Sequence, residues 1–94
     1  MLSQIPADLS KLSKENLNQE LLRIGIIAEL DAINLYEQLA ALTDNPDIKK
    51  VFLDIAKEEK THVGEFQTML LRMDKQQVQE MEHAKEEIKE LTGK

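Results

Sequence analysis

The sequence predicts an all-α protein, in which a long antiparallel two-helix hairpin is followed by a shorter C-terminal helix. Of its 94 residues, 41% are hydrophobic but only three are aromatic, so the core must consist mainly of Leu, Ile, Ala and Met. The chain contains three Gly and two Pro, which leaves few places for turns. Apolar residues also recur at helical spacing along two long segments. We expect one domain, residues 1–94.

The first helix is predicted over residues 13–42. Residues 1–12 show no clear period and contain Pro6, so we expect an extended arm, and Ser13 is a suitable N-cap. Two neighbouring apolar strips cover roughly 200° of the helix circumference, against about 100° for an ordinary surface helix. Such a helix needs two packing partners.

The second helix is predicted over residues 46–72, after a break in the apolar pattern. Asn45 is a favourable N-cap, because its side chain can accept a hydrogen bond from a free backbone N–H. Pro46 suits the first helical position, where no N–H partner is needed. The short connection predicts an antiparallel arrangement with the first helix.

The third helix is predicted over residues 75–91. Asp74, followed three residues later by Gln77, resembles a capping box, and Gly93 is a suitable C-cap. The apolar stripe of this helix is too narrow to cover the two wide faces of the hairpin. We therefore expect two copies to dimerise into a four-helix bundle.

Composition excludes several classes of function. The absence of Cys rules out disulfides and thiolate metal sites. A net charge of −6 argues against nucleic acid and anionic membrane as partners. No apolar run approaches the roughly 20 residues that span a bilayer, and no signal peptide is evident at the N-terminus. We expect a cytoplasmic protein whose acidic surface attracts cations.

Glu59 and His62 are three residues apart in the second helix and therefore share one face. That face is otherwise apolar. Its other members are Ile48, Phe52, Ile55, Ala56, Val63, Phe66, Leu70 and Met73. A carboxylate and an imidazole in such a stripe need partners, because burying either of them unpaired is unfavourable.

Glu29 occupies the centre of the apolar face of the first helix. In a hairpin that turns near residue 44, residues whose numbers add up to about 88 lie level, as Glu29 and Glu59 do. Two buried carboxylates repel each other unless they are protonated or bridged by a cation. With His62 they form half the ligand set of a di-iron carboxylate bundle, suited to Fe(II), with Mn(II), Zn(II) or Ca(II) as substitutes. The alternative is a structural Glu–His pair without metal.

A second Glu-x-x-His motif, Glu80 to His83, falls on the polar side of the third helix, where we expect an exposed histidine. Tyr36 lies two turns from Glu29 on the same face, and is either a core tyrosine or a residue whose hydroxyl steadies a ligand. Asp31 points away from Glu29 and either guides cations or is an ordinary surface aspartate.

Gly25 lies one turn before Glu29. Glycine costs about 1 kcal/mol relative to alanine inside a helix. The residue either permits close approach of the helices beside the site or has no such role.

At these positions the chain resembles the encapsulated ferritins of the ferritin-like superfamily. The resemblance extends from about Leu21 to Met73 and rests on residues 28–36 (AELDAINLY) and 54–62 (DIAKEEKTH). Residues 86–93 (EEIKELTG) also resemble members that are fused to an encapsulin shell protein.

The resemblance implies a di-iron ferroxidase centre between two chains of a ferritin-like bundle. Each chain would contribute Glu29, Glu59 and His62, with Glu59 bridging two irons, and Tyr36 would lie beside these ligands. Dimers would assemble into a ring inside an encapsulin nanocompartment that stores the oxidised iron. Asp31 matches an acidic position implicated in metal uptake.

The chain departs from the family at two points. Ala28 replaces a glutamate that some relatives carry, so the route by which iron enters is weaker or different here. No distinct apolar targeting tail follows Leu91. Either the natural chain continues into a shell domain or loading works otherwise.

Two functional hypotheses follow, and a third is less specific. The first is a ferroxidase that oxidises Fe(II) with O₂ or peroxide. The second is a non-catalytic helical assembly whose interface metal is structural or buffering. The third is an interaction bundle without metal.

Overall fold

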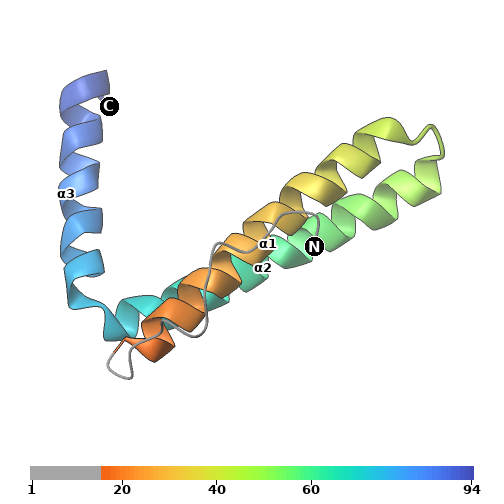
Figure 1. The fold of residues 1–94 in the computed structure, drawn as a ribbon. Helices are drawn as coiled ribbons and strands as arrows, with labels where there is room; N and C mark the ends of the chain where they lie inside the picture. Colours follow the sequence, from red (N-terminus) through yellow and green to blue (C-terminus); the bar gives the residue numbers. More distant parts are fainter. Residues whose placement is uncertain (1–15) are drawn as a thin grey trace.

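The computed structural model describes residues 16–94, which form three α-helices and no strand (Figure 1). Helix α1 comprises Leu17–Leu42, α2 comprises Pro46–Met73 and α3 comprises Lys75–Thr92. The predicted all-α class is confirmed. The helices end within one residue of the expected positions at residues 42, 72 and 91.

Two of the helix starts form through the side chains that the sequence indicates. Asn45 Oδ1 accepts hydrogen bonds from the backbone N–H groups of Asp47 at 3.0 Å and Ile48 at 3.1 Å. Asp74 Oδ1 accepts one from the N–H of Gln77 at 3.0 Å. Each bond satisfies a donor that the helix itself cannot pair.

The C-terminal end of α3 also follows its sequence signal. Gly93 adopts a φ of 74°, in the left-handed region that favours glycine, and its N–H donates to the carbonyl of Lys89 at 2.8 Å. The predicted arm, 1–12, and the predicted cap, Ser13, lie outside the described residues. Helix α1 begins at Leu17.

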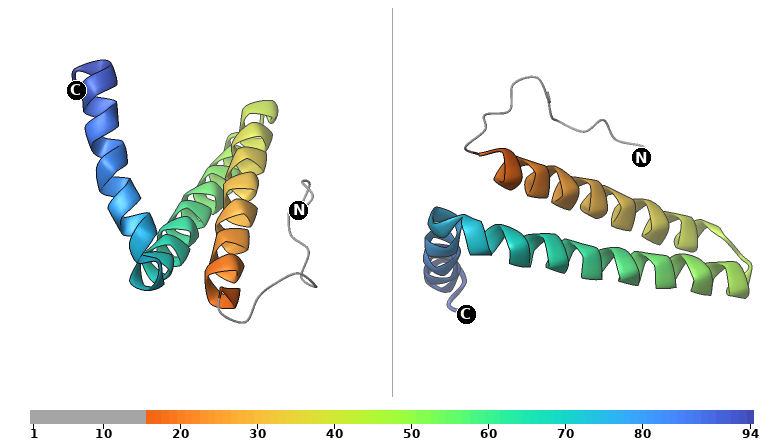
Figure 2. Two further views of the ribbon diagram at one scale, coloured as in Figure 1. Left: turned by 60° about the vertical axis from the view of Figure 1, so that its left-hand side comes forward. Right: turned by 90° about the horizontal axis from the view of Figure 1, so that it is seen from below.

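Helices α1 and α2 run antiparallel and side by side along their whole length (Figures 1 and 2). The rings of Tyr36 and Phe52 stack between them, with centroids 6.2 Å apart. Farther along, Lys60 Nζ lies 3.0 Å from Glu37 Oε2. The residue numbers of the stacked pair add up to 88, as the sequence predicts for level residues, whereas those of the ion pair add up to 97.

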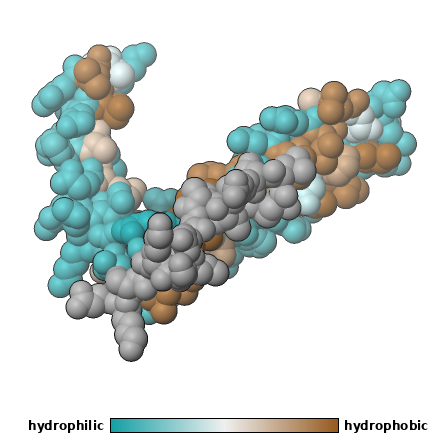
Figure 3. Space-filling view, viewed as in Figure 1, coloured by the Kyte–Doolittle hydropathy of each residue, from teal (hydrophilic) through white to brown (hydrophobic). Residues whose placement is uncertain are grey.

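The hairpin has a small core for its length. Four described residues are buried, namely Ile33, Ala40, Ala56 and Leu70. Many large apolar side chains remain exposed, and Figure 3 shows them along the hairpin and near the free end of α3. Contiguous exposed apolar surface of this kind is typical of interaction surfaces.

Helix α3 turns away from the hairpin, so that the two form a V (Figure 2). The junction is held by Arg23 of α1, whose Nη2 lies 2.7 Å from Asp74 Oδ2. Gln67 Nε2 of α2 lies 3.9 Å from the sulfur of Met81. No residue of α3 is buried. None of the described helices is long and apolar enough to cross a membrane.

Candidate metal centre

Glu29 of α1 converges with Glu59 and His62 of α2. One ligand atom from each of the three residues lies within 4.8 Å of the others. His62 Nδ1 is 3.5 Å from Glu29 Oε2 and 3.6 Å from Glu59 Oε2. The three residues that the sequence singles out as metal ligands are therefore brought together within one chain.

The register of the two helices and the direction in which their side chains lean bring these three residues together. Glu29 and Glu59 bring ligand atoms within 4.8 Å of each other, and the stack of Tyr36 on Phe52 two turns away has the same sum of residue numbers. Side chains on a helix lean toward its N-terminus, so His62 leans back toward the level of Glu59. The imidazole nitrogen consequently faces both carboxylates.

The charges within this cluster are not balanced by other side chains. Among the described residues, no Lys or Arg lies within ion-pair distance of Glu29 or Glu59, because Lys60 instead pairs with Glu37. Glu29 Oε2 is buried and has no hydrogen-bond partner in the described part of the chain. A buried carboxylate oxygen without a partner is strongly unfavourable unless a proton or cation satisfies it.

The donor set fits a metal ion. The separations of 3.5 and 3.6 Å are long for hydrogen bonds. Two ligand atoms bound at about 2.1 Å to one ion lie at most about 4.2 Å apart, so both separations are compatible with shared coordination. Carboxylate oxygens with one imidazole suit Fe(II), Mn(II) and Zn(II).

The cluster lies at the edge of the hairpin rather than inside it. The side chains of Glu29 and Glu59 are 20% and 19% exposed, whereas that of His62 is 45% exposed. Three protein ligands on an open face leave coordination positions that this chain does not fill.

The other predicted site residues lie outside this cluster. Tyr36 packs on Phe52, and its hydroxyl makes no hydrogen bond to Glu29 in the described structure. Asp31 follows Glu29 by two residues, which places it about 200° around the helix. Neither belongs to the group of ligand atoms that converge.

The second Glu-x-x-His motif is exposed, as the sequence predicts. His83 Nδ1 lies 3.3 Å from Glu80 and Nε2 lies 3.2 Å from Glu87. The hydrogen bond with Glu80, followed by the negative charge of Glu87, raises the pKa of His83 above its usual value. Glu80 and Glu87 contact opposite nitrogens of the ring, and among residues 16–94 these side chains do not form a group of three converging ligand atoms.

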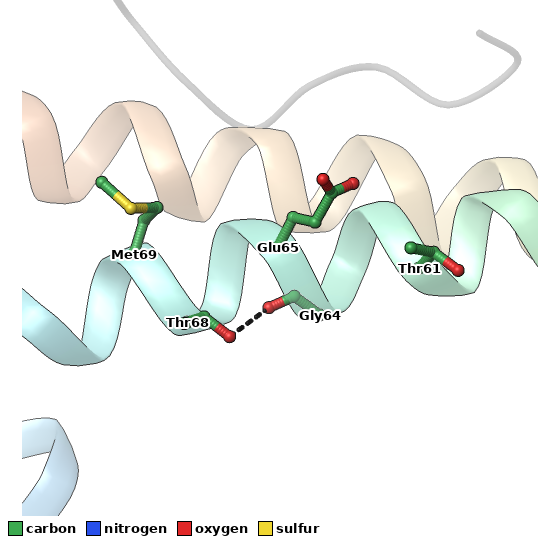
Figure 4. A pocket seen from close by; sticks show the side chains of 5 residues that line it. All are labelled: Thr61, Gly64, Glu65, Thr68 and Met69. Atoms are coloured by element: carbon green, nitrogen blue, oxygen red, sulfur yellow. Dashed lines mark hydrogen bonds between the residues drawn. The ribbon is translucent and has the colours of Figure 1, made fainter.

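An open pocket on α2 is separate from the cluster. Its lining residues are Thr61, Gly64, Glu65, Thr68 and Met69 (Figure 4). None of the three converging residues belongs to it. Thr68 Oγ1 donates a hydrogen bond to the carbonyl of Gly64 at 2.7 Å, and this bond is internal to the helix.

Two contacts between the helices are not evident in the sequence. The ring of Phe66 lies against Gly25, and Arg23 pairs with Asp74 at the start of α3. Phe66 lies in the same apolar stripe as Glu59, and this is the only feature of the sequence that indicates its position. The ion pair spans 51 positions and has no local signal.

Comparisons with known proteins agree with this arrangement. The sequence model of the family Rubrerythrin matches residues 20–92. The chain is 56% identical over 81 residues to a ferritin-like-encapsulin shell fusion protein of Pyrococcus furiosus, covering 86% of this chain and 23% of that protein. It is 40% identical over 67 residues to the encapsulin nanocompartment cargo protein EncC of Myxococcus xanthus. That match covers 71% of this chain and 49% of EncC, so the chain spans half or less of each curated relative.

A solved structure resembles the whole chain. The crystal structure of the encapsulated ferritin domain from Pyrococcus furiosus superposes with a TM-score of 0.84 and 48% sequence identity. The match covers 100% of this chain and 98% of that one. The chain therefore belongs to the rubrerythrin family and is a ferritin-like domain of the encapsulated ferritin kind.

Proposed function

We propose that this chain is a ferroxidase that takes Fe(II) as its substrate at a site shared by two copies of the chain. The observation that carries the proposal is the convergence of Glu29, Glu59 and His62 on a buried Glu29 oxygen that accepts no hydrogen bond and has only the imidazole nitrogen 3.5 Å away. Without a cation the two carboxylates lie close together and are faced by one imidazole alone. A divalent metal ion would satisfy all three residues.

A second copy would complete the site. The exposed edge of His62 lies on the side of the hairpin that also presents Val51 and Met69, which are 58% and 42% exposed. A two-fold axis through this side would bring two sets of Glu29, Glu59 and His62 together. The resulting four-helix bundle would hold two metal ions, and its pairs could assemble further into a ring.

The chain's own residues would bind and orient the iron. Carboxylates favour Fe(III) over Fe(II), so Glu29 and Glu59 would lower the free energy of the oxidised product, and Glu59 would bridge the two ions. His62 would complete each ligand set. Two Fe(II) release two electrons, and O₂ takes them up with two protons to give H₂O₂. With H₂O₂ as oxidant, two further Fe(II) and two protons give two waters.

The relatives suggest where this chemistry takes place. One is named as an encapsulin shell fusion and another as encapsulin nanocompartment cargo. We propose that this chain likewise associates with an encapsulin shell and works inside it, within the cytoplasm. The shell would retain the Fe(III) product, which an open bundle cannot enclose.

The test is Fe(II) oxidation by stopped-flow absorbance, combined with an anaerobic Fe(II) titration by native mass spectrometry. We expect two irons per two chains and rapid oxidation, and loss of both on replacing Glu29, Glu59 or His62 by Ala. His83→Ala is the matched control, because it removes a Glu-x-x-His histidine from an exposed position. Wild-type rates in the three site variants would contradict the proposal. Metal binding without oxidation would instead favour a structural or buffering role.

A further inference from the structure

Gly25 of α1 and Phe66 of α2 pack closely beside the cluster of Glu29, Glu59 and His62. A Cβ atom at Gly25 would lie 3.1, 3.2 and 3.4 Å from three carbons of the Phe66 ring. Ordinary van der Waals contact between carbon atoms lies at about 3.5–4.0 Å. An added Cβ would therefore crowd the ring, which would have to move by a few tenths of an ångström.

This contact lies one helical turn from the ligands on both helices. Gly25 precedes Glu29 by four residues, and Phe66 follows His62 by four. Residues four apart lie on the same face of a helix. The distance between α1 and α2 at Gly25 is thus coupled directly to the distance between Glu29 and His62.

We propose that the packing of Phe66 on Gly25 positions the residues of the metal site. This packing sets the distance between α1 and α2, and therefore the separation of Glu29 from His62 and Glu59. This inference rests on the proposed metal site. It assigns Gly25 and Phe66 no contact with the metal. They act through the helix separation.

The magnitudes involved support this role. Bringing a Cβ at position 25 from 3.1 Å to ordinary contact requires a shift of about 0.3 Å or more in the ring or the helix. Metal–ligand distances are held to within about 0.2 Å. Where the helices rather than the ring take up this shift, it is larger than the spread of metal–ligand distances. The stack of Tyr36 on Phe52, on the other side of the ligands, keeps the hairpin closed there.

The helix propensities of glycine and alanine allow an effect on metal binding to be distinguished from a general loss of stability. Alanine stabilises a helix interior by about 1 kcal/mol relative to glycine. Gly25→Ala should therefore leave the metal-free protein as stable as the wild type, or nearly so, while it weakens metal binding. A glycine with a purely structural role would change both properties in the same direction.

Gly64 of α2 provides the matched control. It is also a glycine inside a helix, and it lines the open pocket on α2 (Figure 4). A Cβ there would meet nothing within 4 Å. Gly64→Ala should raise helix stability and leave metal affinity unchanged. The two substitutions add the same methyl group and differ only in what it meets.

The experiment uses the full chain and titrates it anaerobically with Co(II), followed by the visible absorption of the bound ion. Gly25→Ala is expected to weaken Co(II) binding by about tenfold or more, the range found when groups that support metal ligands are altered. It should also change the intensity of the Co(II) absorption. Unfolding of the metal-free chain and the dimer fraction by native mass spectrometry are recorded in parallel.

Phe66→Leu supplies the rescue, because the smaller side chain leaves room for the added methyl group. The effect of Gly25→Ala on Co(II) affinity should shrink to less than about threefold when Phe66→Leu is also present. Equal Co(II) affinity in wild type and Gly25→Ala, or a loss that Phe66→Leu does not relieve, would overturn the inference. If wild-type chain binds no Co(II) and oxidises no Fe(II), it is the proposed function that fails.

Discussion

Tyr36 and Phe52 stack with ring centroids 6.2 Å apart, and their residue numbers add up to the same value as those of Glu29 and Glu59. The aromatic pair therefore reports the register that places the two carboxylates level. It also closes the hairpin on one side of the cluster, as Phe66 on Gly25 does on the other.

Two substitutions of Tyr36 test the roles of its ring and its hydroxyl separately. Tyr36→Phe keeps the stack, so we expect the free energy of unfolding to stay within about 0.5 kcal/mol and Co(II) affinity to stay near wild type. Tyr36→Ala removes a half-buried ring and should cost about 2 kcal/mol, less than a fully buried aromatic residue. Urea unfolding and Co(II) titration test both variants. A large loss of metal affinity in Tyr36→Phe would mean that the hydroxyl reaches a ligand.

Metal should strengthen association of the chain. Glu29 and Glu59 repel each other without a cation, and a shared site would collect two such pairs. We expect Fe(II) or Zn(II) to raise the dimer fraction in sedimentation velocity. Glu59→Gln, which removes one charge, should associate more readily without metal and respond less to it. Identical populations with and without metal would be inconsistent with an interfacial site.

The dimer should use the face of α2 that carries His62. At 100° per residue, Val51 lies about 20° from His62 around the helix, whereas Leu53 lies about 180° away. The two residues are 58% and 47% exposed, so Lys is tolerated at either position in the single chain. Val51→Lys should abolish the dimer and rapid Fe(II) oxidation. Leu53→Lys should preserve the dimer, and the reverse pattern would place the interface on the opposite face.

Asp74 should control the ordering of α3, because it both caps the helix and binds Arg23. Asp74→Ala removes both interactions and should cost about 1–2 kcal/mol, mainly through the cap, since Arg23 is 46% exposed. Asp74→Asn and Arg23→Gln should each cost less than about 1 kcal/mol. The hydrogen-exchange rate of the Gln77 amide measures the effect directly.

The control for this comparison is Lys85→Gln, which breaks an exposed pair with Glu82 at 2.9 Å. It should leave exchange at Gln77 unchanged. Equal exchange in Asp74→Ala and the wild type would mean that the cap does not hold the start of α3.

The stability of α3 should depend on pH through His83. The hydrogen bond with Glu80 and the charge of Glu87 raise the pKa of His83 in the folded chain above its unfolded value of about 6.5. The pairs are therefore fully stabilising below the unfolded pKa, and this contribution is lost as pH rises through the folded pKa. The ring-proton shift of His83 should titrate above pH 6.5.

Two variants test this pH dependence. Glu80→Gln should lower the pKa of His83 the most, because its hydrogen bond is the main cause of the shift. His83→Gln should reduce the change in the stability of α3 over the same pH range. A pKa of His83 that Glu80→Gln leaves unchanged would contradict the assignment.

Local sequence signals predict the three helices, the caps at Asn45, Asp74 and Gly93, and the level placement of Glu29 and Glu59. These features depend on interactions within about four residues and on the fixed rise of a helix, both of which can be counted along the chain. The closeness of His62 to both carboxylates follows from the same counting, because an antiparallel hairpin with a short turn has one register.

The direction of α3 and the packing of Phe66 on Gly25 depend on contacts between residues far apart in the chain. A single residue, Asp74, separates α2 from α3, and its φ of −104° and ψ of 87° set the angle of the V. Such a dihedral pair is selected by distant contacts, here with Arg23, rather than by local propensity. Likewise, the approach of Phe66 to Gly25 depends on how closely the two helices pack. This distance is set by the shapes of the side chains and cannot be read from residue spacing.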